Sequence, residues 1–138
     1  MKFAWLLAGV LISVAELSAA DPPIKVIAHS SVLVSHVSAE DLKGVFLETK
    51  TSLGDGHVVP VLLKRGAVHA AFVKKHTGKT TTALENYYRS LVFTGKGAMP
   101  KMLGSDAEMV AYVRSTRGAI GYVSAESSTE GVRVLAVD

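Results

Sequence analysis

Short apolar segments alternate along the chain with segments that begin at a capping residue and carry apolar side chains at helical spacing. The first apolar segment covers residues 24–29, and the segment that begins at Ser38 places Leu42, Val45 and Phe46 at positions i, i+3 and i+4. Each helix must bury its apolar stripe against a sheet, so this alternation indicates an α/β fold with a mixed or parallel sheet flanked by helices.

The elements expected from this alternation are four strands and four helices. We expect strands over residues 24–29, 58–63, 119–123 and 132–137, and helices over 39–47, 67–76, 83–92 and from 105 to about 115. Residues 32–37 fit either a strand or an extended loop, and Pro60 argues for an edge position or an irregular end of its strand. Residues 93–104 are rich in glycine and are expected to form a loop.

The N-terminal segment, residues 1–20, has the features of a secretory signal peptide. Lys2 is followed by an almost continuous apolar run, and Ser18 and Ala20 are small residues at positions −3 and −1 of a cleavage site before Asp21. A membrane anchor is the alternative, but the run is short of the roughly 20 residues that a spanning helix needs. We therefore expect a signal peptide over 1–20 and one exported, periplasmic domain over 21–138.

Composition excludes several classes of protein. The chain has 138 residues and no cysteine, which rules out disulfides, thiolate nucleophiles and cysteine metal sites. Its formal net charge of +3 indicates a slight preference for anionic partners. It is not the strongly basic charge that is typical of a nucleic-acid-binding protein.

Motifs that would indicate an enzyme, a cofactor or a metal are incomplete. Gly78-Lys79-Thr80 has Val73 where a phosphate-binding P-loop needs its first glycine, so it is interpreted as a helix end followed by a helix cap. The five histidines form no metal-binding pattern and are interpreted as surface residues, although His69 and His76 could share a helix face. No serine has nucleophile-elbow spacing. The sequence therefore predicts no catalysis, cofactor or metal.

The junctions between loops and helices offer a possible oxyanion site. Lys64 and Arg65 come directly before Gly66 and Ala67, where a helix is expected to begin, and Ser30 and Ser31 close the first strand. Backbone N–H groups at a helix start, a cation and a hydroxyl together suit a tetrahedral anion. These six residues are the candidate ligand-binding residues. The alternative is that Lys64 and Arg65 are solvated surface charges.

Several segments together resemble the phosphate ABC transporter substrate-binding proteins, which are periplasmic binding proteins of type 2. The segments are residues 38–47, 87–97, 104–113 and 116–123, and the resemblance extends over roughly residues 24–125. It is greatest to short single-lobe relatives of this family. The resemblance implies a three-layer α/β lobe, a location outside the inner membrane, a phosphate-like ligand and a membrane transporter as partner.

Two functions remain open. One is an exported solute-binding protein that takes phosphate or a similar oxyanion. The other is an accessory or protein-interaction module, for instance with an envelope protein, that keeps the lobe fold without binding a ligand. The second is favoured by Val68 and Ala70, which stand where the family carries Ser and Thr.

Overall fold

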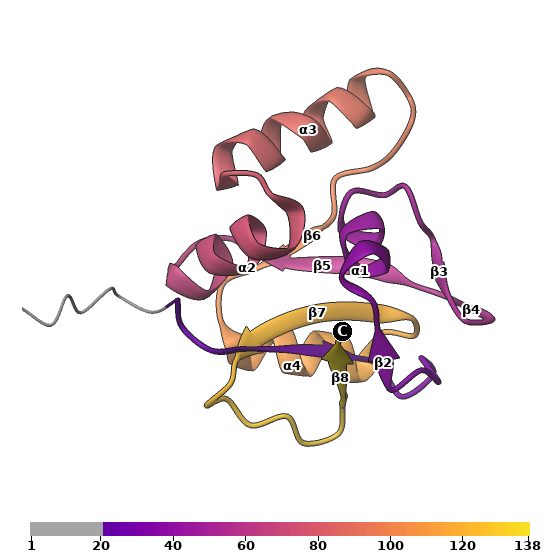
Figure 1. The fold of residues 1–138 in the computed structure, drawn as a ribbon, viewed down its shortest axis with the longest axis vertical. Coiled ribbons are helices and arrows are strands. Elements are labelled where there is room, and N and C mark those ends of the chain that lie inside the picture. The colour runs from indigo at the N-terminus through magenta and orange to yellow at the C-terminus, as the bar shows by residue number, and fades with distance from the viewer. Residues whose placement is uncertain (1–20) are drawn as a thin grey trace, which may run out of the picture.

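The computed structural model describes residues 21–138, so the predicted signal peptide lies outside the described part of the chain. Figure 1 shows a central sheet with helices on both sides. The sheet has six strands in the order β2-β8-β1-β7-β5-β6, and β3 and β4 form a separate hairpin. The strands are β1 (Ile24–Ala28), β2 (His36–Val37), β3 (Ser52–Leu53), β4 (Gly56–His57), β5 (Val59–Leu63), β6 (Lys101–Leu103), β7 (Ala119–Ser124) and β8 (Arg133–Val137).

The sheet is mixed, as expected. Strand β1 is antiparallel to both of its neighbours, β7 and β8, whereas β5 is parallel to both β7 and β6. Strand β5 changes partner along its length, because Val59 and Pro60 pair with β7 and the next three residues pair with β6. Pro60 therefore lies at an irregular position and not on an edge strand, which resolves the two alternatives for this residue.

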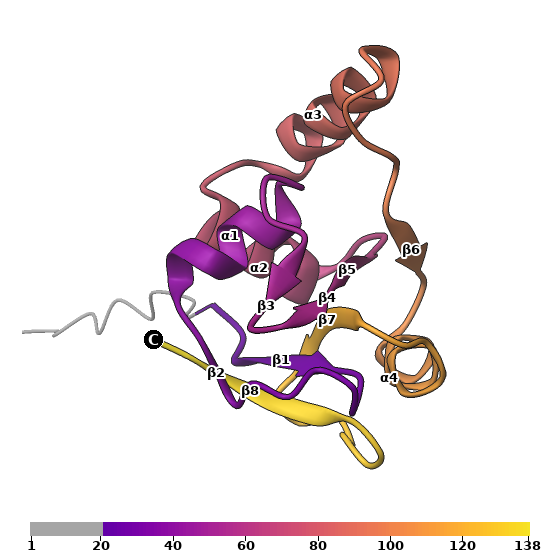
Figure 2. The same ribbon diagram turned by 90° about the vertical axis from the view of Figure 1, so that its right-hand side faces the viewer.

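Helices cover the two faces of the sheet unequally, in three layers. The helices are α1 (Ala39–Phe46), α2 (Ala67–Thr77), α3 (Thr81–Phe93) and α4 (Asp106–Ser115). Figure 2 shows α4 on one side of the sheet and α1 and α2 on the other, with α3 beyond them. Of the helices in residues 21–138, none is both long enough and apolar enough to cross a membrane.

Strand β7 supplies residues to both layers of the core. The ring of Tyr122 stacks on Phe72 of α2, with centroids 3.8 Å apart, and also meets the edge of Phe46. On the other face, a Cβ at Gly121 would lie 2.6 Å from Sδ of Met109 on α4. Glycine at this position therefore lets α4 approach the sheet closely.

The predicted helix ends are confirmed at their capping residues. The side-chain oxygens of Ser38, Thr80 and Ser105 accept hydrogen bonds from the N–H groups of Asp41, Ala83 and Glu108. Gly78 ends α2 in the left-handed region at φ +71°. The segment Gly78-Lys79-Thr80 is thus a helix end followed by a cap, as interpreted from the sequence.

Three segments differ from the expectation. The glycine-rich loop predicted over 93–104 contains the edge strand β6. The segment after α1, for which no strand was expected, contains the β3–β4 hairpin, and only His36 and Val37 of segment 32–37 form a strand. Strands this short show no periodicity of their own, and β6 exists because it pairs with β5, some 40 residues earlier.

Glu48, just after α1, combines two unfavourable features. Its φ is +59°, in the left-handed region that favours glycine, and its Oε2 is buried without a hydrogen-bond partner. Burial raises the pKa of this carboxyl, against an opposing hydrogen bond from the Ala98 backbone. The conformation alone costs about 1–2 kcal/mol for a residue with a side chain.

We expect Glu48→Gly to raise the free energy of unfolding by about 1–2 kcal/mol, because glycine removes both costs. Glu48→Ala removes only the carboxyl and separates the two contributions. Urea unfolding of the three proteins measures the effect, and a loss of stability in Glu48→Gly would show that the Glu48 side chain stabilises the fold.

Candidate functional site

The parallel strands place three loops along one edge of the sheet. Strands β5, β6 and β7 end at Leu63, Leu103 and Ser124, and all three point the same way. The Lys64 N–H donates to the Leu103 carbonyl at 2.9 Å, which ties the first two loops together. Ligands of α/β proteins usually bind outside the carboxyl ends of such strands. We call this edge the carboxyl edge, and a ligand site is expected there.

The start of α2 lies at the carboxyl edge and lacks a side-chain cap. Gly66 precedes the helix at φ +105°, no side chain of residues 21–138 caps the first turn, and that turn holds no acidic residue. The other three helices of residues 21–138 each have a Ser or Thr cap. The first N–H groups of α2, at Ala67 and Val68, are thus left for water or an anion.

Two cations adjoin this helix start. Lys64 and Arg65 are exposed, as are Gly66 and Ala67, and neither cation forms an ion pair within residues 21–138. Four of the six predicted site residues therefore lie together. They form an open, positively charged junction of backbone N–H groups and cations, which can attract an oxyanion from solution.

The buried side chains of Tyr122 and His69 connect the end of β5 to the start of α2. The Tyr122 hydroxyl accepts a hydrogen bond from the Leu63 N–H at 3.1 Å and is also hydrogen-bonded to Nδ1 of His69, in the first turn of α2. His69 is 5% exposed, so the interpretation of the histidines as surface residues is wrong for this one. The burial arises from a tyrosine 53 positions away, which the helical pattern around His69 does not indicate.

Burial lowers the pKa of His69, with Glu85 opposing, and also lowers that of His76, where Lys75 adds to the effect. Both histidines therefore favour the neutral form in the fold. The unfolded chain takes up protons near pH 6.5, so stability is full above that pH and is lost as the pH falls below it.

We expect the free energy of unfolding to decrease between pH 7 and the lowered histidine pKa values, and His69→Gln to flatten this dependence. Urea unfolding at a series of pH values tests this expectation. Glu48 acts in the opposite sense at lower pH, because its raised pKa favours proton uptake by the folded chain. A dependence that His69→Gln and His76→Gln both leave unchanged would contradict the assignment.

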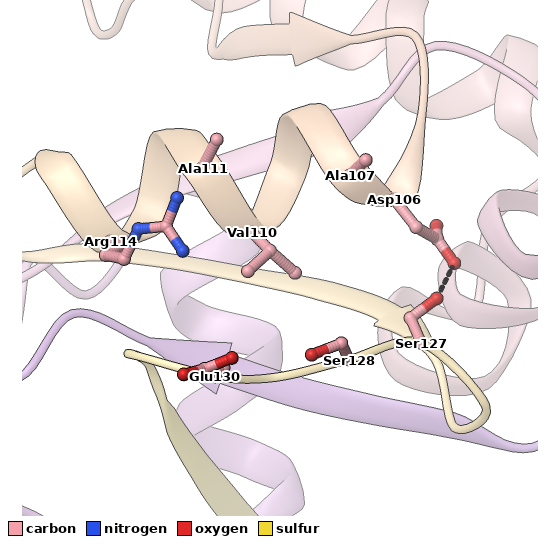
Figure 3. Close-up of a pocket in the computed structure, with 8 residues that line it drawn as sticks. All are labelled: Asp106, Ala107, Val110, Ala111, Arg114, Ser127, Ser128 and Glu130. Atoms are coloured by element: carbon pink, nitrogen blue, oxygen red, sulfur yellow. Dashed lines mark hydrogen bonds between the residues drawn. The ribbon is translucent and has the colours of Figure 1, made fainter.

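The polar side chains at the start of α4, at the same edge, already have hydrogen-bond partners within the fold. Asp106 accepts hydrogen bonds from the Ser124 N–H at 3.1 Å and the Ser127 hydroxyl at 2.5 Å, and Glu108 accepts one from the Gly104 N–H. Beside α4 lies a cavity of about 310 Å³. Figure 3 shows Asp106 and Ser127 at one end of it, the apolar side chain of Val110 between, and Arg114 and Glu130 at the other end.

Ser30 and Ser31 lie at the opposite edge of the sheet. Because β1 runs antiparallel to β7, its carboxyl end meets the start of β7, about 15 Å from the end of β5 at the usual rise per residue. The Ser31 hydroxyl donates to Nδ1 of His29 at 2.8 Å and accepts from the Gly118 N–H at 3.1 Å. The six predicted residues therefore do not form one site.

That opposite edge holds a hollow of its own, which the sequence did not reveal. Ser31, His57, Arg117 and Gly118 line a cavity of about 380 Å³ together with Asp55 and Gly56 of the β3–β4 hairpin. These residues come from three distant segments, and no pattern in the sequence connects them. Among residues 21–138, no three His, Asp or Glu side chains gather in a group that could hold a metal ion.

Comparison with known proteins gives structural matches only. No protein-family model matches the chain, and no curated protein sequence matches it significantly. Among solved structures, the chain is similar to a putative phosphate ABC transporter substrate-binding protein with bound phosphate from Clostridium perfringens (TM-score 0.65, 17% identity, 85% of this chain and 45% of that one). It is also similar to PstS from Borrelia burgdorferi (0.59, 11%, 85% and 47%) and to an ABC-type phosphate transport receptor from Vibrio cholerae (0.56, 15%, 84% and 46%).

These matches confirm the fold that the resemblance implied. The chain has the α/β architecture of phosphate ABC transporter substrate-binding proteins over about 85% of its own length. It spans less than half of the length of those proteins, as a single lobe would.

Proposed function

We propose that the chain is an exported solute-binding protein whose lobe binds phosphate or a similar oxyanion at the start of α2. The observation that carries this proposal is the uncapped helix start at Gly66, flanked by Lys64 and Arg65, at the carboxyl edge of the sheet. The fold shared with phosphate-binding proteins supports it, because one of those structures holds phosphate.

The chemistry of the junction suggests weak binding. The helix dipole and backbone N–H groups favour an anion, and the planar Arg65 guanidinium can donate two parallel hydrogen bonds to it. Val68 and Ala70 supply no hydroxyl, and the junction is open to water. Without burial or further donors, we expect a Kd on the order of 1 mM, which corresponds to about 4 kcal/mol.

Titration calorimetry of residues 21–138 with phosphate, and with sulfate, tests the proposal. We expect Arg65→Ala to weaken binding at least tenfold, since a hydrogen bond to a charged group contributes about 1.5–3 kcal/mol. Arg133→Ala is the matched control, because Arg133 is an exposed arginine at the start of β8. No heat at millimolar phosphate or sulfate, or an equal loss in both variants, would contradict the assignment.

Export through residues 1–20 is a separate part of the proposal. If these residues are a signal peptide, the chain expressed in a bacterium is recovered from the periplasm and its N-terminal sequence begins at Asp21. Recovery of the uncleaved chain from the cytoplasm would refute this part. Periplasmic fractionation followed by N-terminal sequencing distinguishes the results.

A second candidate function is an accessory module that keeps the lobe fold and binds a protein. The missing hydroxyls at Val68 and Ala70 favour it. Light scattering and crosslinking in periplasmic extract test this candidate. A strictly monomeric chain that crosslinks to nothing, and that binds phosphate with the expected Arg65 dependence, would exclude the accessory role.

A further inference from the structure

The end of α3 carries a group of exposed apolar side chains at the periphery of the fold. Phe93 is 95% exposed, and Val92 and Met99 are almost half exposed. With the exposed Lys96, these residues form what we call the α3 tip. Figures 1 and 2 both show the end of α3 and the loop after it, within residues 21–138, far from the sheet.

The α3 tip is held in a defined conformation. The N–H groups of Lys96 and Gly97 both donate to the Leu91 carbonyl, at 2.8 and 3.2 Å, and Gly95 turns the chain at φ +70°. Gly97 lies against the carboxyl of Glu48, where a Cβ would come within 2.5 Å of Oε2. The fold therefore holds Phe93 in water, where an apolar side chain of this size is unfavourable.

The charged residues of the segment that forms the tip are all positive. Residues 86–105 contain no acidic residue, and they include Arg89, Lys96 and Lys101. Arg89 lies one helical turn before Phe93 and is paired with Glu85 only at 3.8 Å, on an exposed surface where such a pair contributes little. Glu48 is the neighbouring acid, and its Oε2 is buried against Gly97. The tip thus combines apolar side chains with positive charge.

We propose that the α3 tip docks on an anionic lipid surface, with Phe93 inserted into the interface. An anionic bilayer supplies acyl chains as an apolar layer for Phe93 and headgroups as negative charge for Lys96. One aromatic side chain and a few cations give weak, reversible binding. The proposal is independent of the oxyanion site, since the tip shares no residue with the start of α2.

A tryptophan at position 93 reports insertion directly. The one tryptophan of the chain is Trp5, so residues 21–138 have none, and they contain the entire core described for the fold. Omitting residues 1–20 also removes their own apolar run. After circular dichroism confirms folding, Phe93→Trp is mixed with phosphatidylcholine vesicles, with and without phosphatidylglycerol. We expect its emission to shift to shorter wavelength only with phosphatidylglycerol.

Leu33→Trp is the matched control, because Leu33 is 80% exposed and no Lys or Arg occurs in residues 26–42. Its emission should not change with either vesicle. In the Phe93→Trp background, Lys96→Gln should weaken vesicle binding about fivefold, the factor that corresponds to about 1 kcal/mol per cation.

Three results would overturn the proposal. They are an unshifted Phe93→Trp emission, an equal shift in Leu33→Trp, and a shift without vesicles that grows with protein concentration. The last result would indicate a second copy as the occupant of the tip. An unshifted emission that a purified envelope protein then shifts would indicate a protein groove instead.

Discussion

Phe72→Ala is expected to lower the free energy of unfolding by about 3–5 kcal/mol, the usual range for removing a buried aromatic ring. Phe72 is fully buried, stacks on Tyr122 and meets the edge of Phe46 at a centroid distance of 4.8 Å. Its loss leaves a cavity where α1, α2 and the sheet meet. Because domains of this size are only marginally stable, the variant should be close to unfolding at 37 °C.

The same substitution at Phe93 is the control for this prediction. Phe93 is 95% exposed, so Phe93→Ala should change stability by no more than about 0.5 kcal/mol. Urea unfolding followed by circular dichroism measures both. Equal effects of the two substitutions would show that the core is not arranged around the Phe72–Tyr122 stack.

Gly118→Ala is expected to cost about 2–5 kcal/mol, the sum of two contributions. Gly118 has φ +78°, which costs a residue with a side chain about 1–2 kcal/mol. An added Cβ would also lie 2.6 Å from the carbonyl oxygen of His57, a backbone atom that cannot rotate away. Overpacking of this kind typically costs about 1–3 kcal/mol more.

Gly95→Ala separates these two contributions. Gly95 has a similar φ of +70°, but no atom lies within 4 Å of the position of its added Cβ. This variant should lose only the conformational part, about 1–2 kcal/mol. Comparable losses in Gly118→Ala and Gly95→Ala would mean that the chain at His57 shifts to make room.

The helices could be predicted from the sequence because their signals are local. Each predicted cap, such as Ser38 or Thr80, lies within three residues of the N–H group that it binds. The long strands could be predicted for the same reason. The strand β6 could not be predicted, because its three residues acquire their conformation from pairing with Val61, Leu62 and Leu63 of β5.

The candidate site was predicted only in part. Lys64 and Arg65 adjoin the helix start in the sequence, so their proximity to Ala67 needed no tertiary information. Ser31 was grouped with them because it closes the first strand and supplies a hydroxyl. The antiparallel direction of β1 moves it to the other edge, and strand direction follows from the packing of the entire sheet.

The position of the oxyanion is the central claim, and amide chemical shifts test it most directly. Phosphate is added to isotope-labelled residues 21–138 while the backbone N–H resonances are recorded by NMR. The account predicts saturable shifts at Ala67 and Val68, reduced in Arg65→Ala, with Ser31 and Gly118 unaffected. Shifts confined to the edge of Ser31 and Gly118, or no shift at any residue, would contradict it.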